Sequence, residues 1–125
     1  MSERQTILVV EDDEDLRRLF RTSLALAGYD VIEAGDGLEA LQRIEELLPD
    51  LVVLDLMLPG FSGVIVRQEL ASQPMTRHIP VVVITGSPLL PEGLDVDCVL
   101  RKPATPDQLI ASVRRCLASQ AGGAV

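Results

Sequence analysis

The stretch Leu51-Val52-Val53-Leu54-Asp55 decides the fold, because four apolar residues run without interruption and end in a carboxylate. Two other runs, Ile7–Val10 and Val81–Ile84, are equally short and rich in β-branched residues. Continuous runs of this length are typical of strands buried on both faces, as in a parallel sheet covered by helices. With two weaker strand candidates, Tyr29–Glu33 and Cys98–Arg101, the sequence predicts five strands.

Between these runs the apolar residues recur at helical spacing. The pattern predicts helices near Leu16–Ala27 and Ala40–Leu48, and a third from Ser62 to about Ser72. In the first of these, Arg17, Arg18 and Arg21 fall on the polar face. The last helix begins at a capping box, Thr105-Pro106-Asp107-Gln108, with proline at the first helical position. Strands that alternate with helices predict an α/β fold with a doubly wound parallel sheet.

The interval between Thr85 and Lys102 interrupts this alternation, because a helix, its loops and the last strand would all have to fit in it. Pro88, Pro91 and Gly93 lie inside the interval. We therefore expect a shortened fourth helix that begins near Pro91, or none at all.

Length and composition predict a single domain over residues 1–125, with a core from about 6 to 118 and a frayed tail over 119–125. Hydrophobic residues make up 47% of the chain, which excludes a disordered acidic tail. The formal net charge is −8, with 11 basic against 19 acidic residues. Because duplex binding needs clustered Lys and Arg, we expect no nucleic-acid partner.

We expect neither a signal peptide nor a membrane span, because a span needs an apolar run of about 20 residues and the sequence has none of that length. Its two cysteines, Cys98 and Cys116, lack the spacing of a metal site. We interpret them as unpaired core residues of a cytoplasmic protein, with no membrane partner.

Polar residues gather where the predicted strands end. Glu11 and Asp12 follow the first strand, Asp55 ends the third, Thr85 ends the fourth and Lys102 follows the fifth. The carboxyl ends of parallel strands open on one edge of the sheet, where ligands bind. Clustered carboxylates repel one another unless a cation neutralises them, and Mg²⁺ prefers such oxygen ligands and commonly partners a phosphate. Lysine and threonine would then supply a charge and a hydroxyl for that phosphate.

Simpler interpretations of the same residues stay open. Asp13 is expected to cap the helix that follows it. Glu11 and Asp12 could form a solvated cluster, Asp55 and Lys102 a structural ion pair, and Thr85 could serve only as a strand former. His78, the only histidine, is expected to be a surface residue.

Four motifs in this order resemble the receiver domain of two-component response regulators. They are Val9–Asp13, Val53–Gly60 around Asp55, Thr85-Gly86 and Lys102-Pro103, and the stretch Ala34–Leu41 is also similar. The resemblance runs from about Ile7 to Leu117. It implies a flavodoxin-like fold with five parallel strands in the order 2-1-3-4-5.

The resemblance also implies a role for each residue of the site. Asp55 would accept a phosphoryl group from a phosphohistidine on a sensor histidine kinase or a phosphotransfer protein. Glu11, Asp12, Asp55 and the backbone carbonyl of Met57 would hold Mg²⁺, while Thr85 and Lys102 would bind the phosphoryl oxygens. Such a bacterial protein is a switch that signals to a downstream protein by contact. It assists its own phosphorylation and dephosphorylation but is not a turnover enzyme.

The chain departs from the family on the face that usually signals. Val99 and Ala104 stand where aromatic residues are common, so we expect no aromatic flip and a response in Gly86–Val96 instead. Val99 and the shortened fourth helix favour the alternative of a pseudo-receiver, a protein-binding module that works without phosphorylation, whereas the complete set of acidic residues and lysine opposes it.

Two other functions fit less well. A magnesium phosphohydrolase of the Asp-x-Asp type would need an acid where Met57 stands. The stretch Gly35–Ala40 matches a dinucleotide-binding fingerprint, but it follows the second strand, and Asp36 with Glu39 is better explained as a capping box.

Overall fold

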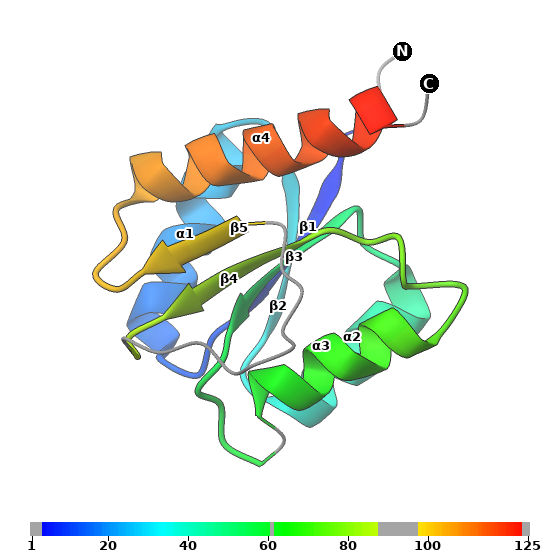
Figure 1. Cartoon of the computed structure of the whole chain (residues 1–125). Coiled ribbons are helices and arrows are strands. Elements are labelled where there is room, and N and C mark those ends of the chain that lie inside the picture. The colour runs from blue at the N-terminus through cyan, green and yellow to red at the C-terminus, as the bar shows by residue number, and fades with distance from the viewer. Residues whose placement is uncertain (1–3, 61, 88–97, 124–125) are drawn as a thin grey trace.

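Figure 1 shows the computed structural model of the chain, which describes residues 4–60, 62–87 and 98–123. Five parallel strands form one sheet in the order β2-β1-β3-β4-β5, as predicted. Their bounds are β1 (Thr6–Val10), β2 (Asp30–Ala34), β3 (Leu51–Asp55), β4 (Val81–Thr85) and β5 (Cys98–Arg101). The described helices are α1 (Glu14–Leu26), α2 (Gly37–Leu47), α3 (Gly63–Ser72) and α4 (Pro106–Gly123).

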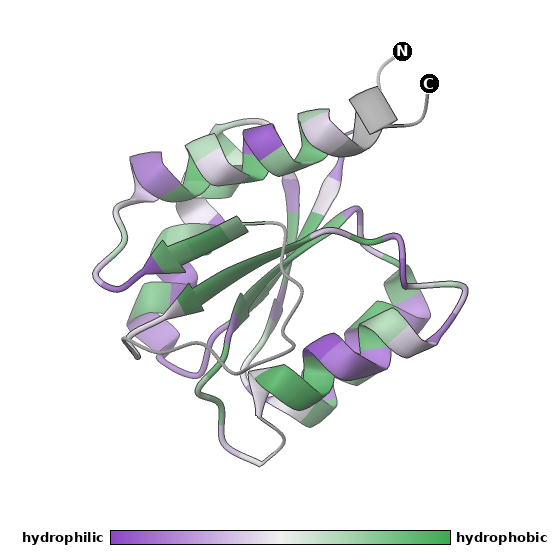
Figure 2. Cartoon of the chain, in the orientation of Figure 1, coloured by the Kyte–Doolittle hydropathy of each residue, from purple (hydrophilic) through white to green (hydrophobic). Residues whose placement is uncertain are grey.

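The helices cover both faces of the sheet, with α1 and α4 on one side and α2 and α3 on the other (Figure 1). Each face has its own apolar core. Leu8, Val52 and Val83 contribute to the core under α2 and α3, whereas Val9 and Val53 contribute to the one under α1 and α4. Every residue of β3 and β4 is buried, and these strands are among the most hydrophobic parts of the chain (Figure 2). Their continuous apolar pattern follows from this burial on both faces.

Side-chain caps fix where the helices begin. The carboxylate of Asp13 accepts a hydrogen bond from the Leu16 N–H, as predicted for an N-cap. At α2, Asp36 accepts from the Glu39 N–H, as predicted for an N-cap, while the Glu39 carboxylate accepts from the N–H of Gly35, one residue before the cap, rather than from the cap itself as in a capping box. The stretch Gly35–Ala40, which matches a dinucleotide-binding fingerprint, therefore forms the start of helix α2.

A glycine lets α3 pack closely against the end of β3. A Cβ atom on Gly63 would lie 2.6 Å from the Leu56 Cα and would also collide with the Asp55 carbonyl oxygen. The Gly63 N–H donates to the Leu56 carbonyl at 3.0 Å, so the two backbones touch directly. This contact fixes the chain immediately after Asp55.

Two expectations differ from the structure, and one lies outside it. Cys98 on β5 and Cys116 on α4 form a disulfide, so the prediction of two unpaired thiols is corrected. The reason is geometric: α4 folds back over the face toward which Cys98 points, and both residues belong to the same core. The helix α4 also continues to Gly123, into the predicted frayed tail, although its last buried residue among the described side chains is Leu117. The predicted short fourth helix lies in residues 88–97, outside the described residues.

Candidate functional site

Three chain segments bring charged side chains together at the carboxyl edge of the sheet. Glu11 follows β1, Asp55 ends β3 and Lys102 follows β5. Glu11 and Asp55 are only 2% and 3% exposed. The Lys102 Nζ lies 2.8 Å from the Asp55 Oδ2 and 3.1 Å from the Glu11 Oε1. One ammonium group therefore forms ion pairs with two buried carboxylates. The positions of these residues at the strand ends predicted that they would lie close together.

Asp12 completes an acidic cluster at the solvent side. One carboxylate oxygen each from Glu11, Asp12 and Asp55 lie within 4.8 Å of one another, and Asp12 is exposed. Three carboxylates against one ammonium leave an excess of negative charge. The sequence predicted this grouping.

Burial dominates the electrostatics of Glu11. It raises the pKa of this carboxyl from 4.5 to about 7, and the neighbouring Asp55 charge acts in the same direction. The Asp13 N–H, which donates to the Glu11 Oε2 at 3.1 Å, and the Lys102 ammonium oppose the rise. Burial also disfavours the charged form of Lys102, but its contacts with the Asp55 and Glu11 carboxylates raise its pKa above 10.5.

The donor set fits a hard divalent cation. Among the described residues, the buried Glu11 Oε1 accepts no well-formed hydrogen bond, although the Lys102 Nζ is near it. A buried carboxylate oxygen without a hydrogen bond is costly. Mg²⁺ commonly keeps several waters and uses one or two carboxylates, so a metal-bound water would satisfy this oxygen.

Met57 lies in the loop after β3 and Thr85 ends β4, and each makes contacts of its own. The Met57 N–H donates to the Asp55 Oδ1 at 2.8 Å, and its side chain is 66% exposed. Thr85 is fully buried at the end of β4, and its Oγ1 accepts from the Ser87 N–H at 3.1 Å. The metal role of the Met57 carbonyl and the phosphate role of Thr85 stay predictions.

Sequence reasoning missed Arg17, which it assigned to the polar face of the first helix. The side chain is only 20% exposed and points toward the site. Its Nη1 donates to the Glu11 carbonyl oxygen at 2.8 Å, and its Nε lies 3.2 Å from the Glu33 Oε1 on β2. Helical periodicity could not reveal this contact, because the partners come from two other segments.

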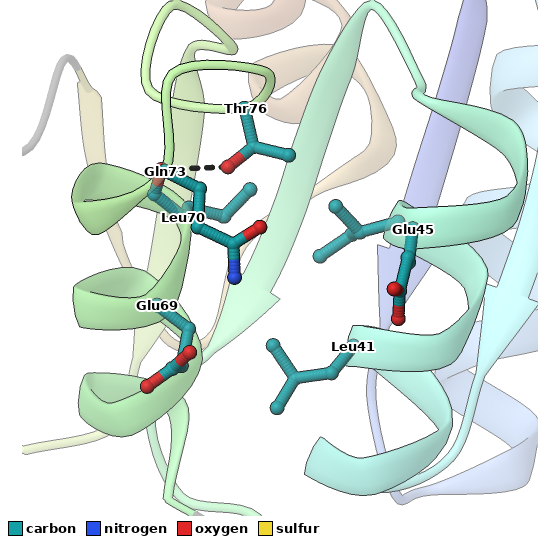
Figure 3. Close-up of a pocket in the computed structure, with 7 residues that line it drawn as sticks. Leu41, Glu45, Glu69, Leu70, Gln73 and Thr76 are labelled. Carbon is teal, nitrogen blue, oxygen red and sulfur yellow. Dashed lines mark hydrogen bonds between the residues drawn. The ribbon is translucent and has the colours of Figure 1, made fainter.

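A second concave region lies between α2 and α3 (Figure 3). This cavity of about 180 Å³ has leucine side chains on both sides and two glutamates at its rim, Glu45 and Glu69. Thr76, which also lines it, donates its hydroxyl hydrogen to the Leu70 carbonyl at 2.8 Å. The cavity does not contain the acidic cluster, so the strand edge is the stronger candidate.

Comparisons with known proteins show which family the chain resembles. The family model of the response regulator receiver domain matches residues 7–114. The chain is 38% identical over 120 residues to a probable transcriptional regulator, ycf27, of Porphyridium aerugineum, covering 92% of this chain and 49% of that protein. It is 40% identical over 116 residues to the DNA-binding response regulator MtrA of Mycolicibacterium paratuberculosis, covering 89% and 50%.

Solved structures show the same fold. A putative response regulator from Chloroflexus aurantiacus superimposes with a TM-score of 0.86 at 30% identity, over 93% of this chain and 99% of that one. A CheY-like receiver domain protein from Methanospirillum hungatei gives a TM-score of 0.90 at 23% identity, over 97% and 99%; this match supports the fold alone.

The chain spans about half the length of the curated relatives it matches. Because several of them are named as DNA-binding regulators, the expectation of no nucleic-acid partner receives no support from the comparisons. Within the described residues, no helix has the length and apolar content needed to cross a bilayer.

Proposed function

The chain belongs to the receiver-domain family of response regulators, which are modules of two-component signalling, and we propose that its phosphoacceptor is Asp55. The phosphoryl donor would be a phosphohistidine on a sensor histidine kinase or a phosphotransfer protein. We also propose that residues 1–125 form a single receiver domain.

One observation carries the assignment: the Lys102 ammonium lies 2.8 Å from the Asp55 Oδ2 within an acidic cluster built by β1 and β3. A structural ion pair needs only one acid, yet this lysine serves two buried ones. Taking several charges out of water is costly, so an arrangement of this kind is typical of functional sites.

The transfer requires positioning and charge neutralisation more than acid–base chemistry. A carboxylate oxygen of Asp55 attacks phosphorus, the new O–P bond forms, and the P–N bond to the histidine breaks with its electron pair left on the imidazole. The Met57 N–H holds the other carboxylate oxygen and so orients the nucleophile. In hydrolysis, water attacks phosphorus and the Asp55 carboxylate leaves.

Once Asp55 carries a phosphoryl group, Lys102 and Thr85 would bind the oxygens of that group. The Lys102 ammonium stays charged because its pKa is raised, and it can neutralise a phosphoryl oxygen as that charge enters the site. Thr85, at the end of the adjacent strand, would offer a hydroxyl donor. These groups assist the chain's own phosphorylation and dephosphorylation, which is a switching cycle rather than turnover of a substrate.

Mg²⁺ would be held by Glu11, Asp12, Asp55 and the Met57 carbonyl. When bound, the ion neutralises charge that develops on the transferring phosphoryl group. Output would pass to a downstream protein by contact with the switched domain.

To test this assignment, the chain is incubated with acetyl phosphate, with and without Mg²⁺, and the mass of the intact protein is measured by mass spectrometry. We expect one labile phosphoryl group on the wild type only with Mg²⁺, and none on the Asp55→Asn variant. Asp107→Asn, which changes an exposed acid on α4, is the matched control and should label like the wild type.

Labelling of Asp55→Asn at the wild-type level would show that the assignment is wrong. A folded wild type that neither labels nor binds beryllofluoride with Mg²⁺ would favour the pseudo-receiver, which docks partners without phosphorylation.

A further inference from the structure

We propose that Arg17 is a positioning residue that holds the metal-binding loop between β1 and α1 in its working conformation. This inference rests on the proposed Mg²⁺ role of Glu11, Asp12 and Asp55. In this proposal Arg17 contacts neither the metal nor the phosphoryl group, so Arg17 can affect Mg²⁺ binding only through the loop.

The Arg17 guanidinium joins three chain segments. Its Nη1 donates to the Glu11 carbonyl oxygen at 2.8 Å, and its Nε lies 3.2 Å from the Glu33 Oε1 on β2. Because the guanidinium is planar and presents its donors in a fixed fork, these two contacts set its orientation. Arg17 therefore links α1, which carries it, to both the loop and the neighbouring strand.

Holding the Glu11 carbonyl also orients Asp12. The carbonyl of Glu11 and the N–H of Asp12 belong to one planar peptide unit, so neither can turn without the other. On the other side of the residue, the Glu11 N–H donates to the Ala34 carbonyl at 3.1 Å. The main chain of Glu11 is thus fixed from both sides, and the direction in which the chain enters Asp12 is fixed with it.

Neighbouring residues keep the guanidinium in this position. A Cβ atom on Gly35 would lie 3.2 Å from the Arg17 Nη1, so glycine leaves the space that the side chain occupies. Glu33 also lies 3.7 Å from the Nε of Arg21, which adds a second cation to the same carboxylate. The side chain of Arg17 is 20% exposed, against 62% for the adjacent Arg18.

Arg18 provides a matched control on the same helix. Its guanidinium pairs only with Glu14, at 3.5 Å within one helix, and both side chains are largely exposed. Exposed pairs of this kind contribute little to stability. Arg17→Met and Arg18→Met remove the same charge one residue apart, but only the first releases the Glu11 carbonyl.

The direction of the effect separates positioning from simple electrostatics. Removing a cation near an acidic cluster should by itself strengthen Mg²⁺ binding, since a like charge is lost. If Arg17 positions the loop, its removal should instead weaken Mg²⁺ binding, because the Asp12 carboxylate spends less time in the cluster. Mutation of residues that orient metal ligands typically lowers the affinity for the metal about 10–100-fold.

The test measures the dissociation constant of Mg²⁺ by isothermal titration calorimetry for four proteins, with the metal-free melting temperature of each. We expect Arg17→Met to raise the constant about tenfold and Arg18→Met to leave it within experimental error of the wild type. Arg17→Lys keeps the positive charge but loses the planar fork that makes both contacts, so it should give an intermediate increase.

An unchanged or lower constant for Arg17→Met, even with a lower melting temperature, would overturn the inference, because the arginine would then be merely structural or electrostatic. If Arg17→Met fails to fold, Arg17→Lys decides: an unchanged constant there overturns the inference, and an increase supports it because the net charge is the same. A wild type that binds no Mg²⁺ would overturn the proposed metal pocket itself, a result distinct from failure of the positioning role alone.

Discussion

At the scale of single residues, the site has two buried acids that depend on one ammonium group. Sequence reasoning predicted which residues gather, because charged side chains at the ends of apolar strands must share the carboxyl edge of a parallel sheet. It could not predict that Glu11 is buried and Asp12 exposed, since both follow β1 directly. Arg17 was missed for a related reason: its partners, Glu11 and Glu33, meet it only in the folded chain.

The burial of Glu11 predicts a pH-dependent stability of the metal-free protein. Its pKa is about 7 in the fold against 4.5 for the ordinary carboxyl, so the folded state binds a proton more tightly than the unfolded state. The stabilisation is complete below 4.5 and is lost as the pH rises through about 7. We expect the melting temperature in EDTA to fall over this window.

Glu11→Gln is the control for this pH dependence. The amide does not titrate, so the fall in melting temperature between these pH values should be reduced relative to the wild type. A wild type and a variant with the same profile would contradict the assignment of the titration to Glu11.

At the scale of elements, local signals were the most predictable. The caps at Asp13, Asp36 and Thr105 depend on residues within one turn of the helix start, and all three were predicted. The pairing of Cys98 with Cys116 depends on how α4 packs on β5, which no local pattern encodes. The prediction of free thiols relied on cysteine number and compartment, and neither carries that geometric information.

The disulfide predicts a stabilising link between β5 and α4. Its cysteines are 18 residues apart in the sequence, and closing a loop of roughly 15 residues contributes about 3 kcal/mol to the free energy of unfolding. We expect urea denaturation to show a loss of about this size when the protein is treated with dithiothreitol.

The double variant Cys98→Ser/Cys116→Ala should respond to neither oxidant nor reductant, which controls for other effects of dithiothreitol. Thiol titration of the unfolded protein, purified without reductant, measures the link directly. Two titratable thiols in that sample would contradict the disulfide.

At the scale of the whole molecule, alternation of strand and helix predicted a doubly wound parallel sheet, while the order of its strands was predicted by the resemblance to receiver domains. Parallel neighbours need crossover helices, and their fixed handedness leaves few arrangements of five strands. The crossover between β4 and β5 was the least predictable part, because Pro88, Pro91 and Gly93 give no clear helical pattern. The expected response of Gly86–Val96 falls mostly outside the described residues.

Val99 stands where the family commonly has an aromatic residue. Whether phosphorylation changes the conformation of this side chain can be tested. Val99 pairs in register with Val83 and packs, partly buried, against the core under α2 and α3. Its β-branched side chain has few allowed rotamers and is too short to move between a buried and an exposed position. We expect methyl NMR with beryllofluoride and Mg²⁺ to show unchanged Val99 rotamer populations, while amide signals at Asp55, Thr85 and Lys102 shift. The methyl groups of the buried Val83 serve as the internal reference. A rotamer change at Val99 without one at Val83 would contradict the prediction, because valine would then move as the aromatic residue of the family does.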